Sequence, residues 1–479
     1  MSRFPVCAAA LAAVVLFLGG TASAQDWTQK TPAHVPAKRT YPAMAQFSNV
    51  SQVSGATNVV MFGGLNLGSS GFFKAFNVLG DTWIWNDTDW TQLTISSSPP
   101  PRYGASMAYY PGTPNGTGGW LIPPVTVLFG GRGAQGNFLA DTWLFSSRTV
   151  CFTKTFCNQA FSWTQVAGSG PSGRIAARMA FSSIFYAALF GGTRGDGIIL
   201  TGGFDGTNYL NDTWRFDAHL QSWQPDIFEV GLFSPGRSDT AVATCRNSLG
   251  AVLFGGFDGS FSSPLGDTWQ HKATEVGGSP EWLQISPSTS PQSRFGHGMA
   301  LYPVSNREVL YGGQGFISFT HTPNLPTDTW NSDCGPWTQA TPAHNPGAKS
   351  FHGMTTGPNG LSVVIFGGNS VTFPQLSSGL TPNGTDSNDT WTWGRRAACL
   401  PSPESTLAVG SRVNCRFDAA AGIEFDGWST QGFAPPARDE LTVSFHTESP
   451  GAASITAYWT DEDGPQSETF TYTIAAPHR

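Results

Sequence analysis

The tripeptide Asp-Thr-Trp occurs six times in this chain, and each copy follows a Gly-Gly pair that ends an apolar run. Successive Gly-Gly pairs are 67, 72, 53, 57 and 55 residues apart, so the sequence consists of units of roughly 50 residues with insertions. The six tripeptides begin at Asp81, Asp141, Asp212, Asp267, Asp328 and Asp389. A repeat of this size cannot bury its own apolar surface, so the units must stack on one another.

Every unit shows the same order of strand and turn signals. In the third, residues 198–201 predict a buried strand, Gly202-Gly203 ends it, residues 212–216 predict the next strand, and Trp223 marks another. We expect the Asp and Thr side chains to bond local backbone amides and the Trp side chain to pack between neighbouring units. A further strand begins at a cationic residue after a proline-rich turn. These cations are Arg39, Arg102, Arg178, Arg237, Arg294 and Lys349.

This set of signals resembles the kelch family of β-propellers over residues 25 to about 395. The second Trp of the first five units is Trp90, Trp163, Trp223, Trp282 and Trp337. The sixth unit has no such residue, whereas Trp27-Thr28-Gln29 near the start of the chain matches the missing strand. We therefore predict an all-β fold, a six-bladed propeller closed by the N-terminal strand. The extra pair Gly191-Gly192 is interpreted as part of a hairpin inside the third blade, with a seventh blade as the alternative.

The two ends of the chain differ from the repeats. Residues 1–24 combine an early Arg3, an apolar stretch and the exit Ala22-Ser23-Ala24, which predicts a signal peptide and a secreted protein, whether extracellular, periplasmic or attached to the cell surface. Residues 25–396 are assigned to the propeller. Residues 397–479 show alternating strand patterns and are predicted to form a small immunoglobulin-like β-sandwich. No later stretch is long and apolar enough to predict a membrane span.

Six cysteines remain after residue 24, which in an exported protein predicts disulfides. Cys151 is close in sequence to Cys157, and Cys399 and Cys415 flank a candidate hairpin. Cys245 and Cys334 lie in different repeats, and whether they meet is left open. Without CxxC spacing, we expect no metal site and no cofactor.

Two equivalent histidines, His297 and His352, follow their cations by three residues. They invite a metal hypothesis, but equivalent positions in two repeats favour a structural origin. The net charge of −7 with no basic run argues against nucleic acid as a partner.

Three long segments between Gly-Gly and Asp-Thr-Trp carry aromatic residues that a plain turn would not need. Because these segments share one face of the propeller with the entrances of the cation-led strands, we expect them to form an aromatic wall at the channel mouth, with local loop packing as the alternative. The candidate ligand-binding residues there are Phe72, Phe73, Phe76, Phe316, Phe319 and Phe373. The kelch resemblance adds Arg102, Arg237 and Arg294 as polar contacts near the channel, although an arginine repeated in nearly every unit also suits a structural role.

The favoured function is a non-catalytic binding module for an extracellular saccharide, protein or surface polymer. One alternative is a sugar-modifying enzyme, since the chain resembles the six-bladed kelch sialic acid epimerases. Another is a structural or adhesive protein of the cell envelope. A converging acid, base and arginine would favour the enzyme, and a broad aromatic rim would favour binding.

Overall fold

The computed structural model describes residues 25–50, 57–66, 77–117, 119–152, 157–185, 194–226, 235–246, 250–260, 264–273, 280–317, 322–370, 386–401, 403, 405–418, 424–434, 441–461 and 464–476. The predicted signal peptide lies outside these residues and stays a prediction. None of the helices in the described part of the chain has the length and apolar character needed to cross a bilayer.

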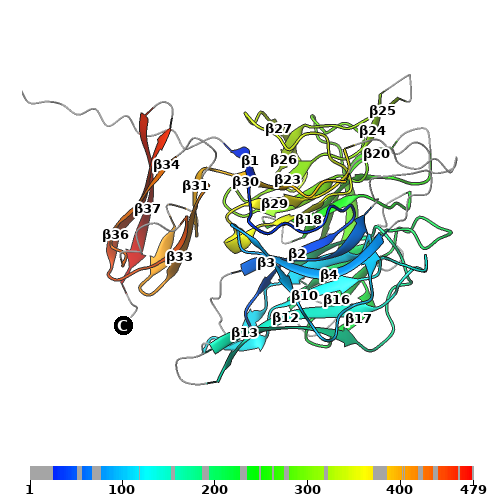
Figure 1. Ribbon diagram of the computed structural model, residues 1–479, viewed down its shortest axis with the longest axis horizontal. Coiled ribbons are helices and arrows are strands. Elements are labelled where there is room, and N and C mark those ends of the chain that lie inside the picture. The colour runs from blue at the N-terminus through cyan, green and yellow to red at the C-terminus, as the bar shows by residue number, and fades with distance from the viewer. Residues whose placement is uncertain are drawn as a thin grey trace, which may run out of the picture.

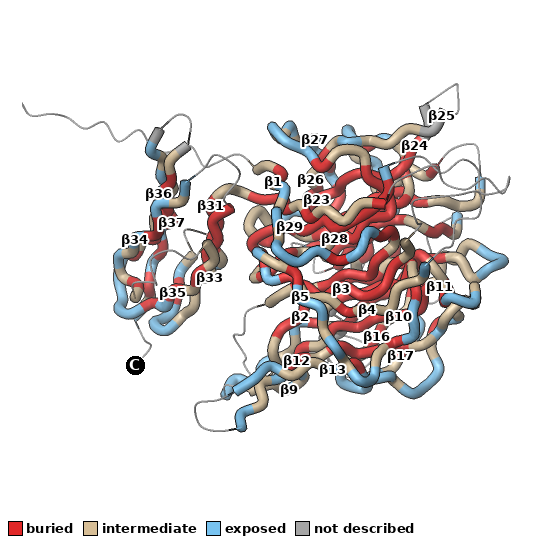
Figure 2. Tube along the Cα trace, in the orientation of Figure 1, coloured by how far each residue is buried: buried red, intermediate tan, exposed pale blue. Residues whose placement is uncertain are grey.

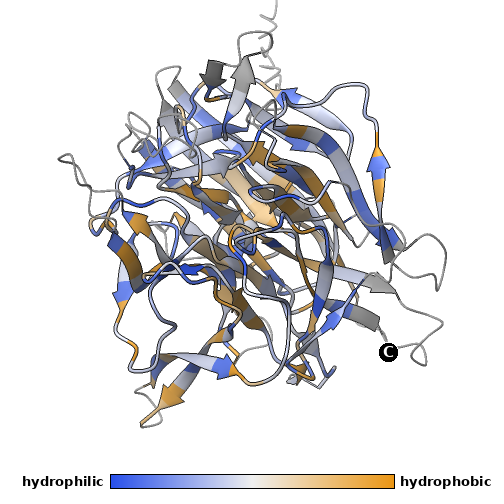
Figure 3. Ribbon diagram, turned by 90° about the vertical axis from the view of Figure 1, so that its right-hand side faces the viewer, coloured by the Kyte–Doolittle hydropathy of each residue, from blue (hydrophilic) through white to orange (hydrophobic). Residues whose placement is uncertain are grey.

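The repeats fold into four-stranded antiparallel sheets arranged around a common axis (Figures 1 and 3). The first sheet contains β2 (Ala43–Ser48), β3 (Thr57–Asn66), β4 (Asn77–Trp85) and β5 (Trp90–Leu93). The second contains β7 (Ser106–Tyr110), β10 (Val125–Phe129), β12 (Thr142–Cys151) and β13 (Cys157–Val166). The third contains β14 (Arg178–Phe185), β15 (Arg194–Thr201), β16 (Thr213–Asp217) and β17 (Ser222–Pro225).

The fourth sheet contains β18 (Ala241–Thr244), β19 (Ala251–Gly256), β20 (Leu265–Ala273) and β21 (Pro280–Ile285). The fifth contains β22 (Gly298–Tyr302), β23 (Arg307–Tyr311), β26 (Thr329–Ser332) and β27 (Trp337–Ala340). The sixth contains β28 (Gly353–Thr356), β29 (Val363–Phe366), β30 (Thr390–Gly394) and β1 (Asp26–Lys30), with the short 3₁₀ helix η1 (Pro358–Gly360) between β28 and β29. Three two-stranded additions are β6 (Arg102–Tyr103) with β11 (Arg132–Gly133), β8 (Thr113–Pro114) with β9 (Trp120–Ile122), and β24 (Gly315–Ile317) with β25 (Thr322–Asn324). The described residues thus hold six four-stranded propeller sheets.

Strand β1 closes the propeller, as the Trp27-Thr28-Gln29 motif predicted. It runs antiparallel to β30, with Trp27 opposite Trp393 and Gln29 opposite Trp391. The apolar core lies between neighbouring sheets, and the central strands are buried while the outer edges are exposed (Figure 2). The first and last parts of the repeat region therefore share one sheet.

The C-terminal part forms two sheets beside the propeller, at the end opposite the β24–β25 hairpin (Figure 1). One contains β31 (Ala397–Leu400), β33 (Arg412–Phe417) and β35 (Thr442–His446). The other contains β32 (Thr406–Ala408), β34 (Glu424–Gln431), β36 (Gly451–Asp461) and β37 (Gly464–Ala475). The two sheets share a buried core that includes Phe417, Trp428 and Trp459. The immunoglobulin-like type stays a prediction.

A buried ionic node joins the C-terminal part to the propeller. The Asp418 carboxylate accepts hydrogen bonds from Lys30 on β1, from the Thr392 hydroxyl on β30 and from Arg416 on β33. Arg416 also pairs with Asp87 in the turn after β4. Residues of the first, the sixth and the C-terminal sheets thus meet at one point.

Both predicted disulfides are present. Cys151 is bonded to Cys157 across the β12–β13 hairpin, and Cys399 to Cys415 between β31 and β33.

Candidate functional site

The repeated cations form buried ion pairs with the repeated aspartates. In five blades the guanidinium binds both carboxylate oxygens of the Asp-Thr-Trp motif at 2.5–2.9 Å and donates to the first Gly-Gly carbonyl at 2.9–3.1 Å. In the sixth, the Lys349 ammonium binds Asp389 at 2.6 Å. Burial alone would raise the pKa of Asp267, but the Arg237 guanidinium outweighs it and keeps that pKa lowered. The arginines offered as ligand contacts, Arg102, Arg237 and Arg294, have almost no exposed surface, and these contacts give each of them a structural role.

The third blade corrects one assignment. Its paired cation is Arg174, which binds Asp212, and not Arg178, which begins the inner strand β14.

The Asp-Thr-Trp motif also works differently from our expectation. Its Asp accepts a bond from the Trp indole of the same motif in every blade, at 2.6–2.8 Å. Its Thr hydroxyl accepts a bond from the second Trp of the following blade, at 2.8–3.1 Å. The motif therefore holds neighbouring blades together through side chains.

A closed ring of backbone hydrogen bonds surrounds the channel two residues after each paired cation. Each amide donates to the carbonyl of the equivalent residue in the neighbouring blade, at 2.7–3.1 Å. The six residues have φ between 53° and 65°, in the left-handed region. They are Tyr41, Gly104, Ala176, Asp239, Gly296 and Phe351. Blades that are distant in sequence are thereby linked at one level of the channel.

Three side chains from opposite sides meet inside this ring. The Tyr41 side chain of the first blade, the Asp239 carboxylate of the fourth and the Arg178 guanidinium of the third interact electrostatically with one another, and the Ser238 hydroxyl donates to Asp239 Oδ2 at 2.9 Å. Burial raises the pKa values of Tyr41 and Asp239 and lowers that of Arg178, because each charged form loses water. We call Tyr41, Asp239 and Arg178 the septum, since they cross the channel at the level of the ring.

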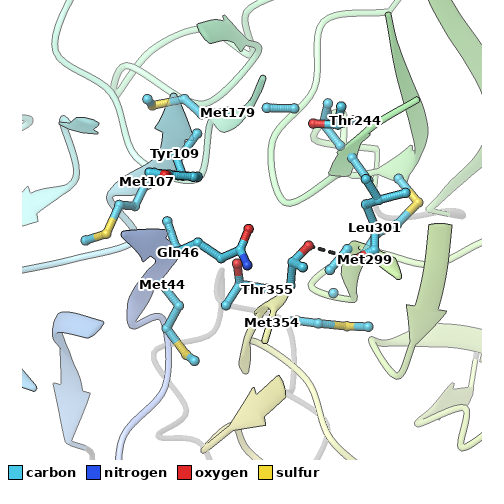
Figure 4. A pocket seen from close by; sticks show the side chains of 18 of the residues that line it. Met44, Gln46, Met107, Tyr109, Met179, Thr244, Met299, Leu301, Met354 and Thr355 are labelled. Carbon is cyan, nitrogen blue, oxygen red and sulfur yellow. Dashed lines mark hydrogen bonds between the residues drawn. The ribbon is translucent and has the colours of Figure 1, made fainter. Parts of the chain in front are cut away.

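Beyond the septum lies a cavity of about 470 Å³. Its wall repeats one pattern five residues after each paired cation, where the side chains are Met44, Met107, Met179, Val242, Met299 and Met354 (Figure 4). Polar groups such as Gln46, Tyr109 and Thr244 also line it. Leu400 of the C-terminal part also lines it. The volume falls within the range of small-ligand pockets.

His297 and His352 border the same cavity. Burial, together with the positive charges of Lys349 and Arg178, lowers the pKa of His352 to about 3, and burial together with the charges of Arg294 and Arg178 lowers the pKa of His297 well below its usual value. Both histidines are therefore neutral at physiological pH. In the described residues they form no group with Cys, Asp or Glu that has the spacing of a metal site.

Eight aromatic rings, including that of the septum residue Tyr41, form a nearly continuous circle around the channel. Neighbouring centroids are 4.4–6.1 Å apart. In order they are Tyr103, Tyr41, Phe351, Phe295, Phe257, Tyr209, Phe204 and Phe138. The Arg132 guanidinium lies 5.4 Å from the Phe138 ring, and Arg132 pairs with Tyr103, so it completes the circle. We call these eight residues the aromatic crown. All of them except Phe351 are partly exposed.

The crown occupies the face on which the sequence predicted an aromatic wall, but different residues build it. Phe72, Phe73, Phe76, Phe319 and Phe373 lie outside the described residues. Phe316 belongs to β24, and its side chain is likewise not described. Four of the eight crown residues directly follow a paired cation or a Gly-Gly pair, and Tyr41 and Phe351 lie two residues after a paired cation. Isolated bridges such as Ile175–Phe204 and Ser238–Phe257 form at these positions. The sequence signal that could have identified the crown was an excess of aromatic residues just after the paired cations and just after the Gly-Gly pairs.

The fold and the channel define a closed β-propeller of four-stranded blades. Residues 52–313 match the family model described as the KLHDC2/KLHL20/DRC7 Kelch-repeats domain. Because this match covers more than half of the chain, the protein belongs to the kelch-repeat family.

Two plant proteins are similar to parts of the chain. The F-box/kelch-repeat protein At1g51550 of Arabidopsis thaliana is 29% identical over 195 residues, 40% of this chain and 36% of that protein. Adagio-like protein 3 of Oryza sativa subsp. japonica is 24% identical over 286 residues, 58% of this chain and 39% of that protein. The chain thus spans less than half the length of either relative.

Proposed function

We propose that this kelch protein is a binding module whose ligand surface is the aromatic crown. The single observation that carries the proposal is the circle of partly exposed rings on one propeller face. Aromatic faces offer large apolar contact area at little conformational cost, and they are enriched at protein interfaces. Kelch domains generally serve as protein-interaction modules, which agrees with this assignment.

The chemistry of the crown suits two ligand classes. Apolar and aromatic side chains of a partner protein can pack on the rings, and sugar rings can stack on them. Polar groups flank the crown at Asp205, Asp258 and Arg132, and a polar border around an apolar patch is typical of interaction sites. We place the ligand outside the cell, as the predicted signal peptide implies, and take it to be an extracellular protein or saccharide.

The test is a binding screen of residues 25–479 against a glycan array and a displayed peptide library. Any ligand found is then measured with Phe257→Ser and Tyr209→Ser, which remove one ring each from the crown. Loss of about 1.4 kcal/mol of contact energy weakens the affinity tenfold, and we expect at least this effect. Phe152→Ser is the matched control, because Phe152 is a 67% exposed aromatic in the β12–β13 turn, away from the crown. Equal affinity for all four proteins, or no ligand in either screen, would refute the proposal.

A second candidate function, modification of a sugar, is favoured by the channel itself. Arg178 and Tyr41 line the cavity together with two neutral histidines, and Asp239 interacts with both Arg178 and Tyr41. A neutral histidine can act as a base and an arginine can hold an anionic substrate group. If this is the activity, N-acyl hexosamines incubated with the protein change their proton NMR spectrum, and Arg178→Met abolishes the change. Unchanged spectra for the tested sugars would remove this candidate and leave the binding proposal standing.

A further inference from the structure

Two cysteines and a glutamate converge in the interface between the fourth and fifth blades. Cys245 directly follows the inner strand β18, Glu308 lies on β23, and Cys334 is in the turn after β26. All three are buried, with 0%, 0% and 6% of their surface exposed. One potential ligand atom from each lies within 4.8 Å of the others. Neither cysteine belongs to the two disulfides of the protein.

Glu308 departs from the repeat at this position. The strand register aligns it with one residue in each other blade, and none of those residues is charged. The equivalents are Val59, Thr126, Ile198, Ala251 and Val363. A carboxyl group is costly in such a dry position unless something compensates its charge or its hydrogen-bonding capacity. Departures from a repeat pattern are expected where a protein has a special site.

The local backbone holds the Cys334 thiol against the carboxyl group. The Cys334 amide donates to Glu308 Oε2 at 2.9 Å, and Cys334 Sγ lies 3.8 Å from Oε1. Cys334 has a φ of 54°, and the next amide, of Gly335, donates to the Ser332 hydroxyl at 2.8 Å. These contacts hold the Cys334 turn beside Glu308 with the thiol close to its carboxyl group.

The separations suit a tetrahedral ion. Bonds of about 2.3 Å to sulfur and about 2.1 Å to oxygen place these two ligands roughly 3.6 Å apart, close to the distance between Cys334 Sγ and Glu308 Oε1. Thiolates select thiophilic ions, and zinc also accepts a carboxylate oxygen. The second thiol, of Cys245, comes from the neighbouring blade and lies within the same 4.8 Å limit.

We propose that Cys245, Glu308 and Cys334 bind a zinc ion that bridges the fourth and fifth blades. Binding releases to solvent the protons that the two thiols and the carboxyl group carry, forms two sulfur–zinc bonds and one oxygen–zinc bond, and involves no oxidation. Cys245 also lines the cavity, so the proposed site adjoins it. The site is independent of the aromatic crown, and it revises our expectation from sequence that the protein holds no metal.

The test measures metal content and coordination in residues 25–479, purified without an affinity tag and without a chelator. We expect about one zinc per chain, and after exchange into Co²⁺ the thiolate-to-cobalt absorption of a tetrahedral sulfur site. Cys245→Ser, Cys334→Ser and Glu308→Gln should each lower the zinc content at least tenfold. Leu310→Met, a volume-conserving change in the same core cluster, should keep it. Tryptophan fluorescence of each variant checks that the blades remain folded.

Three results would overturn the proposal. One is a Cys245–Cys334 disulfide, seen as the absence of thiols when the protein is denatured without reductant. Another is a set of reduced thiols that take up neither zinc nor Co²⁺ at micromolar concentration. The third is zinc content that stays unchanged in all three ligand variants, which would place the ion elsewhere.

Discussion

Asp418 offers the most direct test of how the C-terminal part stabilises the propeller. Its carboxylate is 4% exposed and accepts bonds from Lys30, Thr392 and Arg416, so it connects the closing strand β1, its partner β30 and β33. Burial alone would raise the pKa of Asp418, but Arg416 and Lys30 outweigh it and hold the pKa well below its usual range. The substitution Asp418→Asn keeps the shape and removes the charge.

The expected loss of stability depends on the contacts that Lys30 and Arg416 keep when Asp418 is replaced. Removing one partner of a buried ion pair costs about 3–5 kcal/mol. Lys30 is 13% exposed and can turn toward water, and Arg416 keeps Asp87, so the lower end, about 3 kcal/mol, applies. With an unfolding entropy of about 2.1 cal/mol/K per residue, a unit of roughly 370 residues gives a decrease in Tm of about 4 °C.

Thermal unfolding followed by tryptophan fluorescence at pH 7 measures this shift. The matched control is Asp426→Asn, an exposed carboxylate on β34 that bonds only the Thr460 hydroxyl in the described contacts. The stability contributed by Asp418 is present above the unfolded pKa of about 4 and is lost as the pH falls toward the lower folded pKa. The wild type should therefore approach the variant below pH 4. A Tm for Asp418→Asn within 1 °C of the control would refute the reasoning.

Three further predictions concern the repeat. Asp267→Asn leaves the buried Arg237 without its carboxylate and should cost about 3 kcal/mol, read from the same unfolding assay; a loss below 1 kcal/mol would show that the pair is not essential to the blade. Thr268→Val removes the acceptor of the Trp337 indole and should cost about 1–2 kcal/mol, whereas an unchanged Tm would contradict a stabilising inter-blade bond. His352 has a folded pKa of about 3, so stability should decrease as the pH falls below the unfolded value of about 6.5, by up to about 1.4 kcal/mol per pH unit. His352→Leu should therefore flatten the dependence of Tm on pH between 6.5 and 4, and a parallel decline in both proteins would contradict this.

The repeat architecture could be predicted from sequence because each of its signals recurs in every unit and has one physical cause. Gly-Gly pairs need positive φ, and the observed values at Gly255 and Gly256 are 61° and 115°. Trp27 could be assigned to the last blade because it makes the same bond, to Thr329, that the other second tryptophans make to their own threonines. Because such contacts recur once in each sequence repeat, counting the repeats is enough to predict the number of blades.

The candidate site could be predicted only in part, because its contacts cross the channel. Tyr41 and Asp239 are 198 positions apart and meet only when the ring closes. Arg178 was misassigned because the third blade has two arginines, Arg174 and Arg178, four residues apart, and sequence spacing alone did not show which one faces Asp212. Residues meet across the propeller axis only when the ring of blades is closed, and the sequence of a single repeat carries no signal of such a contact.

The ring of backbone hydrogen bonds also determines what the channel can attract. Each peptide unit has a dipole, and aligned dipoles at a helix end create the partial charge that binds anions. In this ring the six amides from Tyr41 to Phe351 follow one another head to tail around a circle, so their components in its plane cancel. The backbone ring therefore has no net dipole in its plane. The charge preference of the channel is set by a few side chains such as Arg178 and Asp239. A substitution at either of them changes the net charge at this level of the channel while the backbone ring stays the same.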